Sequence, residues 1–433
     1  MEKIWLEKSY PPGVAFEIDA DKYSSLVNLF DKYTELYQNN TAFINMGTSL
    51  TYQELAVQAT AFASYLQQDL GLLKGDKFAI MIPNILQYPI ALFGVLKAGL
   101  TVVNINPLYT PRELQHQLKD SGTKGILILE NFAHVLEKVI DKTDVKHVIT
   151  TGVGDRLGKF KGTLINGVLK YVKKQVPAYN IANAIKFNQV LAKGSKLTFN
   201  PVQVTGQDLA FLQYTGGTTG PAKGVMLTHR NMVANLVQSN EMTRHVFEAG
   251  KEIMITALPL YHVYALTSNC LCFMAYGGVN LLITNPRDMP GFVKELAKYP
   301  FTAITGVNTL FNALLHTPGF EKLDFSALKL GFAGGMSVQR PVAELWEKVT
   351  GVRLLEGYGL TECAPMVTMN PYNQESYDGT IGVPASSTDI RLLNDDGEEV
   401  AIGEPGEMWV KGPQVMKGYY NRQEATDEVL IDD

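Results

Sequence analysis

Short apolar segments alternate with helix-like segments through the first half of the chain, and this alternation limits the possible folds more than any other feature. Phe78–Ile82, Thr101–Ile105 and Gly125–Leu129 read as strands. Between them, Gln87–Lys97 and Pro111–Asp120 read as helices, the second with a proline in its first turn, where no backbone hydrogen bond is lost. Helices between consecutive strands are typical of parallel sheets covered by helices. The sequence therefore predicts an α/β fold.

The length of the chain, 433 residues, exceeds the size at which a single hydrophobic core stops growing. We expect a first α/β subdomain at 1–200, a second α/β subdomain at 201–371 and a small β unit at 372–433. In the last part, glycines separate short apolar runs such as Ile390–Leu393 and Met408–Val410. This pattern is typical of antiparallel strands joined by tight turns.

Charge and cysteine content exclude some classes of protein. A net charge of -5 argues against a nucleic-acid binder, which would carry a basic stripe. The three cysteines, Cys270, Cys272 and Cys363, show neither a metal-binding spacing nor a disulfide pattern, so we expect a reducing, cytoplasmic location. The most apolar stretch, residues 257–283, is interrupted by polar residues and reads as buried protein rather than as a membrane span.

Residues 151–200 are rich in lysine and glycine and allow two interpretations. The favoured one is a solvated surface excursion, because charged runs usually face water. The other is a basic amphipathic contact with anionic lipid, because apolar residues recur there at helical spacing. The residues concerned are Lys159, Lys161, Lys170, Lys173 and Lys174, with Leu164, Val168, Leu169 and Val172.

A run rich in glycine and threonine, YTGGTTGPAKG, covers residues 214–224 and follows an apolar segment. Glycine lets the backbone bring its N–H groups close to phosphate oxygens, while the threonine hydroxyls and Lys223 add donors and positive charge. The position of Lys223 does not fit a Walker A loop. A flexible linker rarely combines these features, so the run predicts a polyphosphate-binding loop. Its candidate residues are Tyr214, Thr215, Gly216, Gly217, Thr218, Thr219, Gly220 and Lys223.

Two shorter glycine-containing runs are weaker signals by themselves. EGYGLTE, at residues 356–362, offers the ring of Tyr358 for stacking on a base and the carboxylate of Glu362 for Mg²⁺, which prefers oxygen ligands. A plain turn fits that run equally well. GFAGGMS, at residues 331–337, lets a flat ligand approach the backbone, or lets a helix pack closely on a strand.

Together, these three runs resemble those of the adenylate-forming superfamily, and the chain is similar to bacterial long-chain fatty-acid–CoA ligases over essentially its whole length. The resemblance implies the N-terminal domain of such an enzyme: two helix-covered β-sheet subdomains and a small distorted β-barrel. Further runs that carry it are PNILQYPIALFGVLKAG, NPLYTPRELQHQL, MLTHRN, LPLYHVYALT, NLLITNPRD, FTAITGVNTLFNALL and VKGPQVMKGYYNRQEATDE.

The resemblance implies a reaction in two steps, with ATP, Mg²⁺ and CoA as cofactors and co-substrate. A fatty-acid carboxylate attacks the α-phosphorus of ATP and pyrophosphate leaves; the thiol of CoA then attacks the acyl-adenylate and AMP leaves. The implied catalytic residues are Lys223, Glu362 and His262, with His262 bordering an acyl tunnel lined by Phe301–Leu315. Thr218 and Glu362 are the implied metal pair. The residues implied beside the nucleotide are Gly334, Gly335, Met336, Glu356, Gly357, Tyr358, Gly359 and Thr361.

The resemblance also implies what lies beyond the end of this chain. Relatives continue with a Gly-Trp-x-x-Thr-Gly-Asp run, a hinge and a C-terminal lid domain that carries a catalytic lysine, so we expect that domain to be absent here and turnover to be poor. Two alternatives remain: a ligase for an aryl or medium-chain acid, and a nucleotide- and lipid-binding module without turnover. Relatives often form homodimers and associate peripherally with the inner membrane, which the residues themselves do not decide.

Overall fold

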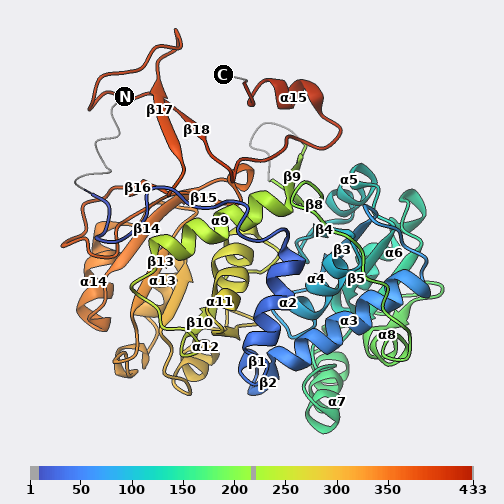
Figure 1. Cartoon of the computed structure of the whole chain (residues 1–433). Coiled ribbons are helices and arrows are strands. Elements are labelled where there is room, and N and C mark those ends of the chain that lie inside the picture. The colour runs from blue at the N-terminus through green and yellow to red at the C-terminus, as the bar shows by residue number, and fades with distance from the viewer. Residues whose placement is uncertain (1–8, 216–220, 432–433) are drawn as a thin grey trace.

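Two β-sheets lie side by side, each with helices on both faces (Figure 1). This arrangement is seen in the computed structural model, which describes residues 9–215 and 221–431. The predicted α/β architecture with two helix-covered sheets is confirmed. Among the described residues, no helix is both long and apolar enough to cross a membrane.

The seven-stranded sheet is parallel except for the pairing of its last two strands, β8 and β9. The strands and helices predicted in the first half of the chain are confirmed to within one residue at their ends. In sheet order the strands are β7 (Ile185–Lys186), β6 (His147–Thr151), β5 (Gly125–Leu129), β3 (Lys77–Met81), β4 (Thr101–Asn104), β8 (Leu209–Tyr214) and β9 (Gly224–Thr228).

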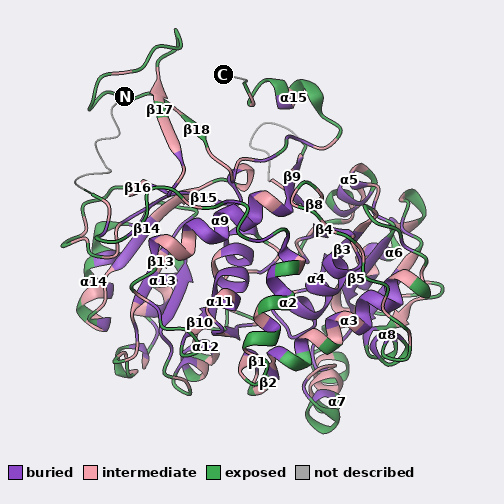
Figure 2. Ribbon diagram, viewed as in Figure 1, coloured by how far each residue is buried: buried purple, intermediate pink, exposed green. Residues whose placement is uncertain are grey.

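Both faces of this sheet are buried, which explains why its strands are continuously apolar rather than alternating. Along β3, Phe78 and Ile80 point into one core cluster, and Ala79 and Met81 point into another on the opposite face. The first cluster includes residues of α2 (Leu26–Leu36), α3 (Tyr52–Gln68), α4 (Gln87–Lys97) and α8 (Phe187–Gly194), and the second includes residues of α5 (Pro111–Ser121) and α6 (Ala133–Glu137). Figure 2 shows the burial of these strands.

The nine-stranded sheet takes its strands from distant parts of the chain. Residues 41–51 supply its far edge, whereas residues 209–228 belong to the seven-stranded sheet. The division between the sheets therefore does not fall at residue 200, and the predicted domain boundaries stay a prediction. In sheet order the strands are β16 (Val383–Pro384), β15 (Met366–Met369), β14 (Leu354–Gly359), β13 (Leu330–Ala333), β12 (Ala303–Gly306), β10 (Ile253–Thr256), β11 (Val279–Leu282), β1 (Thr41–Asn45) and β2 (Thr48–Thr51).

The helices around this sheet bury large side chains on both of its faces. Phe292, Phe311 and Trp346 fill the core on one face, and Met242 and Phe273 fill the core on the other. These side chains come from α12 (Met289–Leu296), α13 (Asn308–Leu315), α14 (Arg340–Thr350), α9 (His229–Met242) and α11 (Cys272–Ala275).

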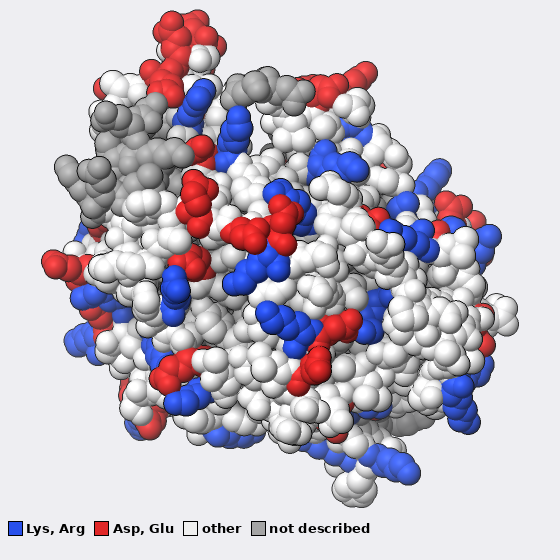
Figure 3. Space-filling view, in the orientation of Figure 1, with Lys and Arg blue, Asp and Glu red and all other residues white. Residues whose placement is uncertain are grey.

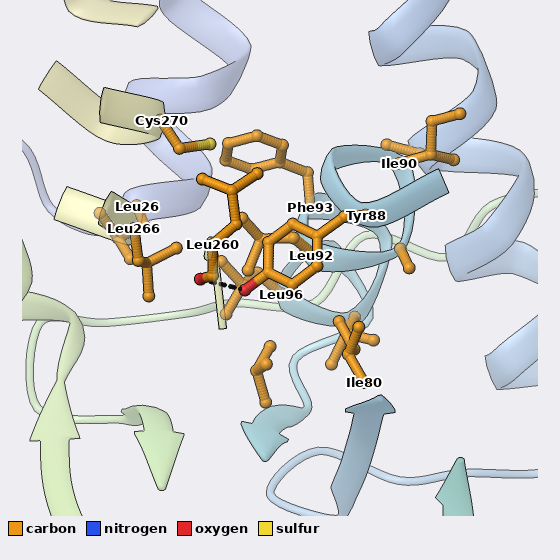
Figure 4. Packing of buried hydrophobic residues seen from close by; sticks show 14 of the residues in the cluster. Leu26, Ile80, Tyr88, Ile90, Leu92, Phe93, Leu96, Leu260, Leu266 and Cys270 are labelled. Atoms are coloured by element: carbon orange, nitrogen blue, oxygen red, sulfur yellow. Dashed lines mark hydrogen bonds between the residues drawn. The ribbon is translucent and has the colours of Figure 1, made fainter. Parts of the chain in front are cut away.

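The apolar stretch at residues 257–283 is buried protein, as predicted. It forms α10 (Val263–Ala265), a π-helical turn at Leu266–Leu271, and then α11 and β11. Leu266 and Cys270 are fully buried in the same cluster as Tyr88 of α4 (Figure 4). The three cysteines are free and buried.

The small antiparallel unit predicted near the end of the chain is present. It consists of β17 (Asp389–Leu393) and β18 (Glu407–Lys411), and a short helix, α15 (Gln423–Asp427), follows. In the part of the chain that the structure describes, these two strands form a separate two-stranded sheet rather than a closed barrel. They project from the body of the molecule (Figure 1).

Candidate active site

The loop at residues 257–262, which follows β10, touches both sheets at the carboxyl ends of their parallel strands. Asn84, which lies just beyond β3 of the other sheet, donates from Nδ2 to the Thr256 carbonyl oxygen at 3.0 Å. It also accepts a hydrogen bond at Oδ1 from the Leu260 backbone N–H at 2.8 Å. From β10 the chain goes first to β11 on one side and then to β12 on the other. Ligands of open α/β sheets bind at such a reversal of strand order.

Buried polar side chains of the seven-stranded sheet and of α4 hold this loop in place. The Tyr88 hydroxyl donates to the Leu260 carbonyl oxygen at 2.7 Å (Figure 4), and Gln213 donates to the Tyr261 carbonyl oxygen. Asn104 links Tyr88 to Gln213, because its side chain lies within hydrogen-bond distance of both side chains. Sequence reasoning missed these residues; the available signal was a polar side chain inside an otherwise apolar strand or helix.

His262 ends this loop and faces solvent although protein surrounds much of its ring. Its Nδ1 accepts a hydrogen bond from the Tyr264 backbone N–H at 3.3 Å. Partial desolvation lowers the pKa of His262 below its ordinary value, so the ring is neutral near pH 7. With Nδ1 as acceptor, the proton of the neutral ring belongs on Nε2, which can donate to a carboxylate.

The run at residues 334–336 is positioned next to this loop through Tyr264. The Tyr264 hydroxyl donates to the Phe332 carbonyl oxygen at 3.0 Å, and a Cβ atom added to Gly334 would lie 3.2 Å from the Tyr264 ring. Gly335 has a φ of +76°, which favours glycine. Met336, three residues beyond the end of β13, is half exposed. The strand end is therefore shaped by close packing on one side and open to a ligand on the other.

Strand β14 carries the first four residues of the EGYGLTE run, and both glycines of the run are required by close contacts. A Cβ atom at Gly357 would lie 2.5 Å from the Phe332 ring, and one at Gly359 would lie 2.4 Å from the Pro365 carbonyl oxygen. Between them Tyr358 is half-buried, and burial raises the pKa of its phenol. Glu356 is almost fully buried, and burial also raises the pKa of its carboxyl group.

The phosphate-loop candidate connects β8 to β9, which pair as an antiparallel hairpin. The Thr215 N–H donates to the Lys223 carbonyl oxygen at 3.2 Å, which closes the base of the loop. The Tyr214 hydroxyl donates to Asp120 at 2.8 Å, and burial together with that carboxylate raises the pKa of Tyr214. The predicted residues Gly216, Gly217, Thr218, Thr219 and Gly220 lie outside the described residues.

Lys223 and Glu362 lie on either side of one tyrosine that sequence reasoning did not single out. The Lys223 ammonium nitrogen is 4.6 Å from the centre of the Tyr419 ring, and the Tyr419 hydroxyl donates to Glu362 Oε1 at 2.7 Å. Burial, followed by the hydrogen bond to Glu362, raises the pKa of Tyr419. Two predicted catalytic residues, 139 positions apart in sequence, thus share a neighbour.

Tyr419 reaches this position because residues 416–420 run along the free edge of β9. The Met226 N–H donates to the Gly418 carbonyl oxygen at 2.9 Å, and the Tyr420 N–H donates to that of Gly224 at 2.8 Å. The Met416 N–H donates to the Glu362 carbonyl oxygen at 2.7 Å. This segment therefore joins the phosphate-loop hairpin to the turn that carries Glu362.

The residues present fit a Mg²⁺ ion shared with a polyphosphate. Glu362 supplies a half-buried carboxylate held by one hydrogen bond, and Mg²⁺ usually takes one or two carboxylates and completes its coordination with phosphate oxygens and water. Thr361 is half-buried beside it. Among the described residues, no group of three or more histidine, cysteine, aspartate or glutamate side chains could hold a metal ion.

A cleft of about 680 Å³ opens beside the base of the phosphate-loop hairpin. His116 of the cleft wall contacts the hairpin, because its Nε2 lies 3.0 Å from the Ala222 carbonyl oxygen. Asp120, the acidic residue of the wall, accepts a hydrogen bond from the Tyr214 hydroxyl and forms an ion pair with Arg422 at 2.6 Å. The cationic side chains of the wall are Arg112, Lys119, Lys138, Lys142 and Arg422. The cleft therefore favours an anionic ligand.

The segment predicted to line an acyl tunnel, Phe301–Leu315, comprises β12 and α13. Phe311 and Leu314 are fully buried in the core, and Val307, at the start of α13, is half-buried. Gly306 packs closely against the Phe311 ring. The tunnel itself stays a prediction.

The two sheets meet at the carboxyl ends of their strands, and Lys223 of the phosphate-loop hairpin and the Glu362 carboxylate lie at this junction. Such an arrangement is typical of an α/β enzyme that binds a phosphorylated ligand. The chain belongs to the AMP-binding enzyme family, whose sequence model matches residues 30–420.

Similar proteins agree with this family. A long-chain-fatty-acid–CoA ligase of Yersinia pestis is 59% identical over 432 residues, which cover 100% of this chain and 77% of the relative. A solved long-chain-fatty-acid–CoA ligase of Archaeoglobus fulgidus superposes with a TM-score of 0.82 at 25% identity, covering 98% of this chain and 81% of that one. An anthranilate CoA ligase in complex with anthranoyl-AMP has the same fold, with a TM-score of 0.83 at 18% identity over 95% of this chain and 74% of that one.

Proposed function

We propose that this chain catalyses the ATP- and Mg²⁺-dependent activation of a long-chain fatty acid through an acyl-adenylate to its acyl-CoA, with release of pyrophosphate and AMP. The observation that supports it most is the 59% identity to a long-chain-fatty-acid–CoA ligase, because it extends over 432 residues and so includes every element of the candidate site. The anthranilate ligase shares only the fold and does not decide the acid.

In the first step the chain must align two anions and stabilise the charge that builds on the leaving pyrophosphate. Lys223 supplies positive charge at the phosphate-loop hairpin, and Glu362 would hold Mg²⁺, which neutralises phosphate charge when bound. His262 can donate from Nε2 to an oxygen of the acid. Tyr358 and Gly334–Met336 would border the adenine at the ends of β14 and β13.

The acid is tested by pyrophosphate–ATP exchange on the purified chain with palmitate, octanoate and benzoate. Fastest exchange with palmitate is expected. Fastest exchange with octanoate or benzoate would instead support the alternative of a medium-chain or aryl-acid ligase. Binding of a non-hydrolysable acyl-adenylate analogue without exchange for any acid would support the other alternative, a binding module without turnover.

We propose the basic cleft beside the hairpin as the place where the phosphates of CoA bind. Lys138 and Lys142 lie on its wall and are exposed, so replacing both with alanine should leave the fold intact. Exposed ion pairs contribute up to about 1 kcal/mol each, so the Kd for CoA should rise about tenfold. Titration calorimetry with CoA measures this change.

The matched control for the cleft is replacement of two exposed lysines on the other sheet's helices, Lys294 and Lys348. That control should bind CoA like the parent, and both double variants should keep the parent's pyrophosphate exchange. An unchanged Kd for CoA in the Lys138→Ala, Lys142→Ala variant would exclude the cleft as the CoA site.

A cytoplasmic location, peripheral contact with the inner membrane and a homodimer complete the proposed function. The location rests on the three free cysteines, and the membrane contact and the homodimer rest on the resemblance to bacterial fatty-acid–CoA ligases. Analytical ultracentrifugation of the chain tests the homodimer, which predicts twice the mass of 47.8 kDa.

A further inference from the structure

Helix α7 (Lys159–Gly167) and the π-helical turn that follows it, Val168–Val172, stand out from the body at the end opposite to β17 and β18 (Figure 1). Their outward side carries large apolar side chains that the protein core does not use. The exposed fractions are 85% for Phe160, 57% for Leu164, 74% for Tyr171 and 73% for Val172. Contiguous exposed apolar side chains on a folded protein mark interaction sites.

The inward side of the same segment is firmly attached. Gly154 and Gly162 are in such close contact that a Cβ atom on either would lie under 2.5 Å from the other's backbone oxygen. The Asn166 side chain accepts from the Gly154 N–H at 2.7 Å and donates to Asp155 at 2.8 Å. Ile165 and Leu169 pack against the main core. The outward apolar side chains therefore project from a fixed base.

Charge distinguishes this segment from the rest of the chain. Residues 156–207 contain nine lysines and arginines and neither aspartate nor glutamate, although the whole chain has a net charge of -5. Lys186 and Lys193 of this stretch pair with Glu130 and Asp69. Among the described residues, no acidic side chain lies within ion-pair distance of the lysines on or beside α7, which are Lys159, Lys161, Lys170, Lys173 and Lys174. Blue side chains gather at the lower edge of Figure 3.

We propose that this surface, the α7 face, docks onto an anionic phospholipid bilayer. The α7 face consists of Phe160, Leu164, Tyr171 and Val172 with Lys159, Lys161, Lys170, Lys173 and Lys174. Apolar side chains entering the headgroup region beside lysines are typical of interfacial helices. A protein partner fits less well, because protein interfaces favour arginine and are depleted of lysine.

The purpose of docking rests on the proposed function. A long-chain acid dissolves in the bilayer, so docking would bring the enzyme to its substrate. The docking itself is measured without substrate. Purified chain is floated with phosphatidylcholine vesicles or with vesicles that also contain about 30 mol % phosphatidylglycerol, at low salt and at about 0.5 M NaCl, where the Debye length is about 4 Å. Binding to the anionic vesicles at low salt is expected, with at least a tenfold loss in phosphatidylcholine alone and in high salt.

Two variants test the α7 face itself. Lys170→Gln with Lys173→Gln and Lys174→Gln should lower vesicle binding by roughly 100-fold, and Phe160→Ser with Tyr171→Ser should lower it at least tenfold. All five side chains are exposed, so the melting temperature should not change. The matched control for the lysine variant is the triple substitution Lys294→Gln, Lys322→Gln, Lys348→Gln. The matched control for the apolar variant is the double substitution Val57→Ser, Leu73→Ser. All five side chains are exposed away from the α7 face, and both controls should bind vesicles like the parent.

Three results would overturn the docking proposal: no binding of the parent to anionic vesicles, equal losses in the α7 variants and their controls, or binding to heparin without binding to vesicles. The last result would indicate a general polyanion site. Pyrophosphate exchange with a water-soluble acid in the absence of vesicles reports on the proposed function separately, and the α7 variants should keep the parent's rate in that assay.

Discussion

At the scale of single residues, Tyr419 connects the two charged side chains on which the proposed chemistry depends. Its ring contacts Lys223 and its hydroxyl holds Glu362. The raised pKa keeps the phenol protonated, so it remains a donor to the carboxylate across the physiological pH range. Tyr419 itself is a positioning residue, because it acts on the ligand through Glu362.

Removing only the Tyr419 hydroxyl should therefore weaken Mg²⁺ binding without removing the ring. A hydrogen bond to a charged group contributes about 1.5–3 kcal/mol, so Tyr419→Phe should raise the Mg²⁺ concentration needed for half-maximal exchange by about tenfold or more. Glu362→Gln should raise it further and weaken Mg-ATP binding far more than fatty-acid binding. The double variant should match Glu362→Gln, since the phenol has no carboxylate left to hold. Additive losses in the double variant would contradict this role for Tyr419.

At the scale of elements, α9 begins with a buried histidine that joins it to α2. His229 Nδ1 accepts a hydrogen bond from the Leu26 N–H at 3.2 Å, at the first residue of α2. The helix starts at a capping box in which Thr228 and Asn231 bond each other's backbone N–H. Burial lowers the pKa of His229 to about 4. The junction of the two helices therefore requires a neutral ring.

This junction predicts a loss of stability in mild acid. Above about pH 6.5, the ordinary pKa of an unfolded histidine, the ring is neutral in both states and its contribution is complete. As pH falls from about 6.5 to 4, the unfolded chain binds a proton that the folded chain does not, so the free energy of unfolding falls, by about 2 kcal/mol at pH 5. Urea denaturation of the parent and of His229→Gln at pH 7 and pH 5 measures the difference. If the variant loses as much stability on acidification as the parent, His229 is not the cause.

At the scale of the whole molecule, a few buried hydrogen bonds join the two sheets around the loop that carries His262. Asn84 makes three of them, with the backbones of Thr256, Leu258 and Leu260. These bonds place the proposed acid-binding residue relative to the phosphate-loop strand, which contributes Gln213 to the same loop. The site is therefore a property of the contact between the sheets rather than of either sheet.

Asn84→Ala should lower the free energy of unfolding by about 2–4 kcal/mol, because it leaves buried backbone groups without partners. It should also weaken fatty-acid binding, because the loop loses its fixed position. Urea unfolding and fatty-acid titration measure the two effects. Val57→Ala, at an exposed position of α3, serves as a control that should change neither. Loss of stability with unchanged fatty-acid affinity would show that Asn84 supports the fold alone.

Local pattern alone determined much of this protein. The helices and strands between Phe78 and Leu129 follow from apolar periodicity and from the proline in the first turn of α5, because these signals act over a few residues. Close packing of a helix on a strand, one of the two interpretations that the GFAGGMS run allowed, is seen at Gly331, where a Cβ atom would lie 3.0 Å from Trp346 of α14. The chemistry assigned to Lys223, Glu362 and His262 came from motifs and stays a prediction.

Only the tertiary structure decided which of these motifs meet. Strand exchange between the two halves, with residues 41–51 in one sheet and 209–228 in the other, depends on pairing over long sequence separations, which no local pattern records. Tyr419 lies between Lys223 and Glu362 because residues 416–420 pair with the edge of β9, and Asn84 reaches the His262 loop because the two sheets meet there. The exposure of Phe160 and Tyr171 was likewise open in sequence, because an apolar side chain at helical spacing faces either the core or the solvent until the attached face of the helix is known.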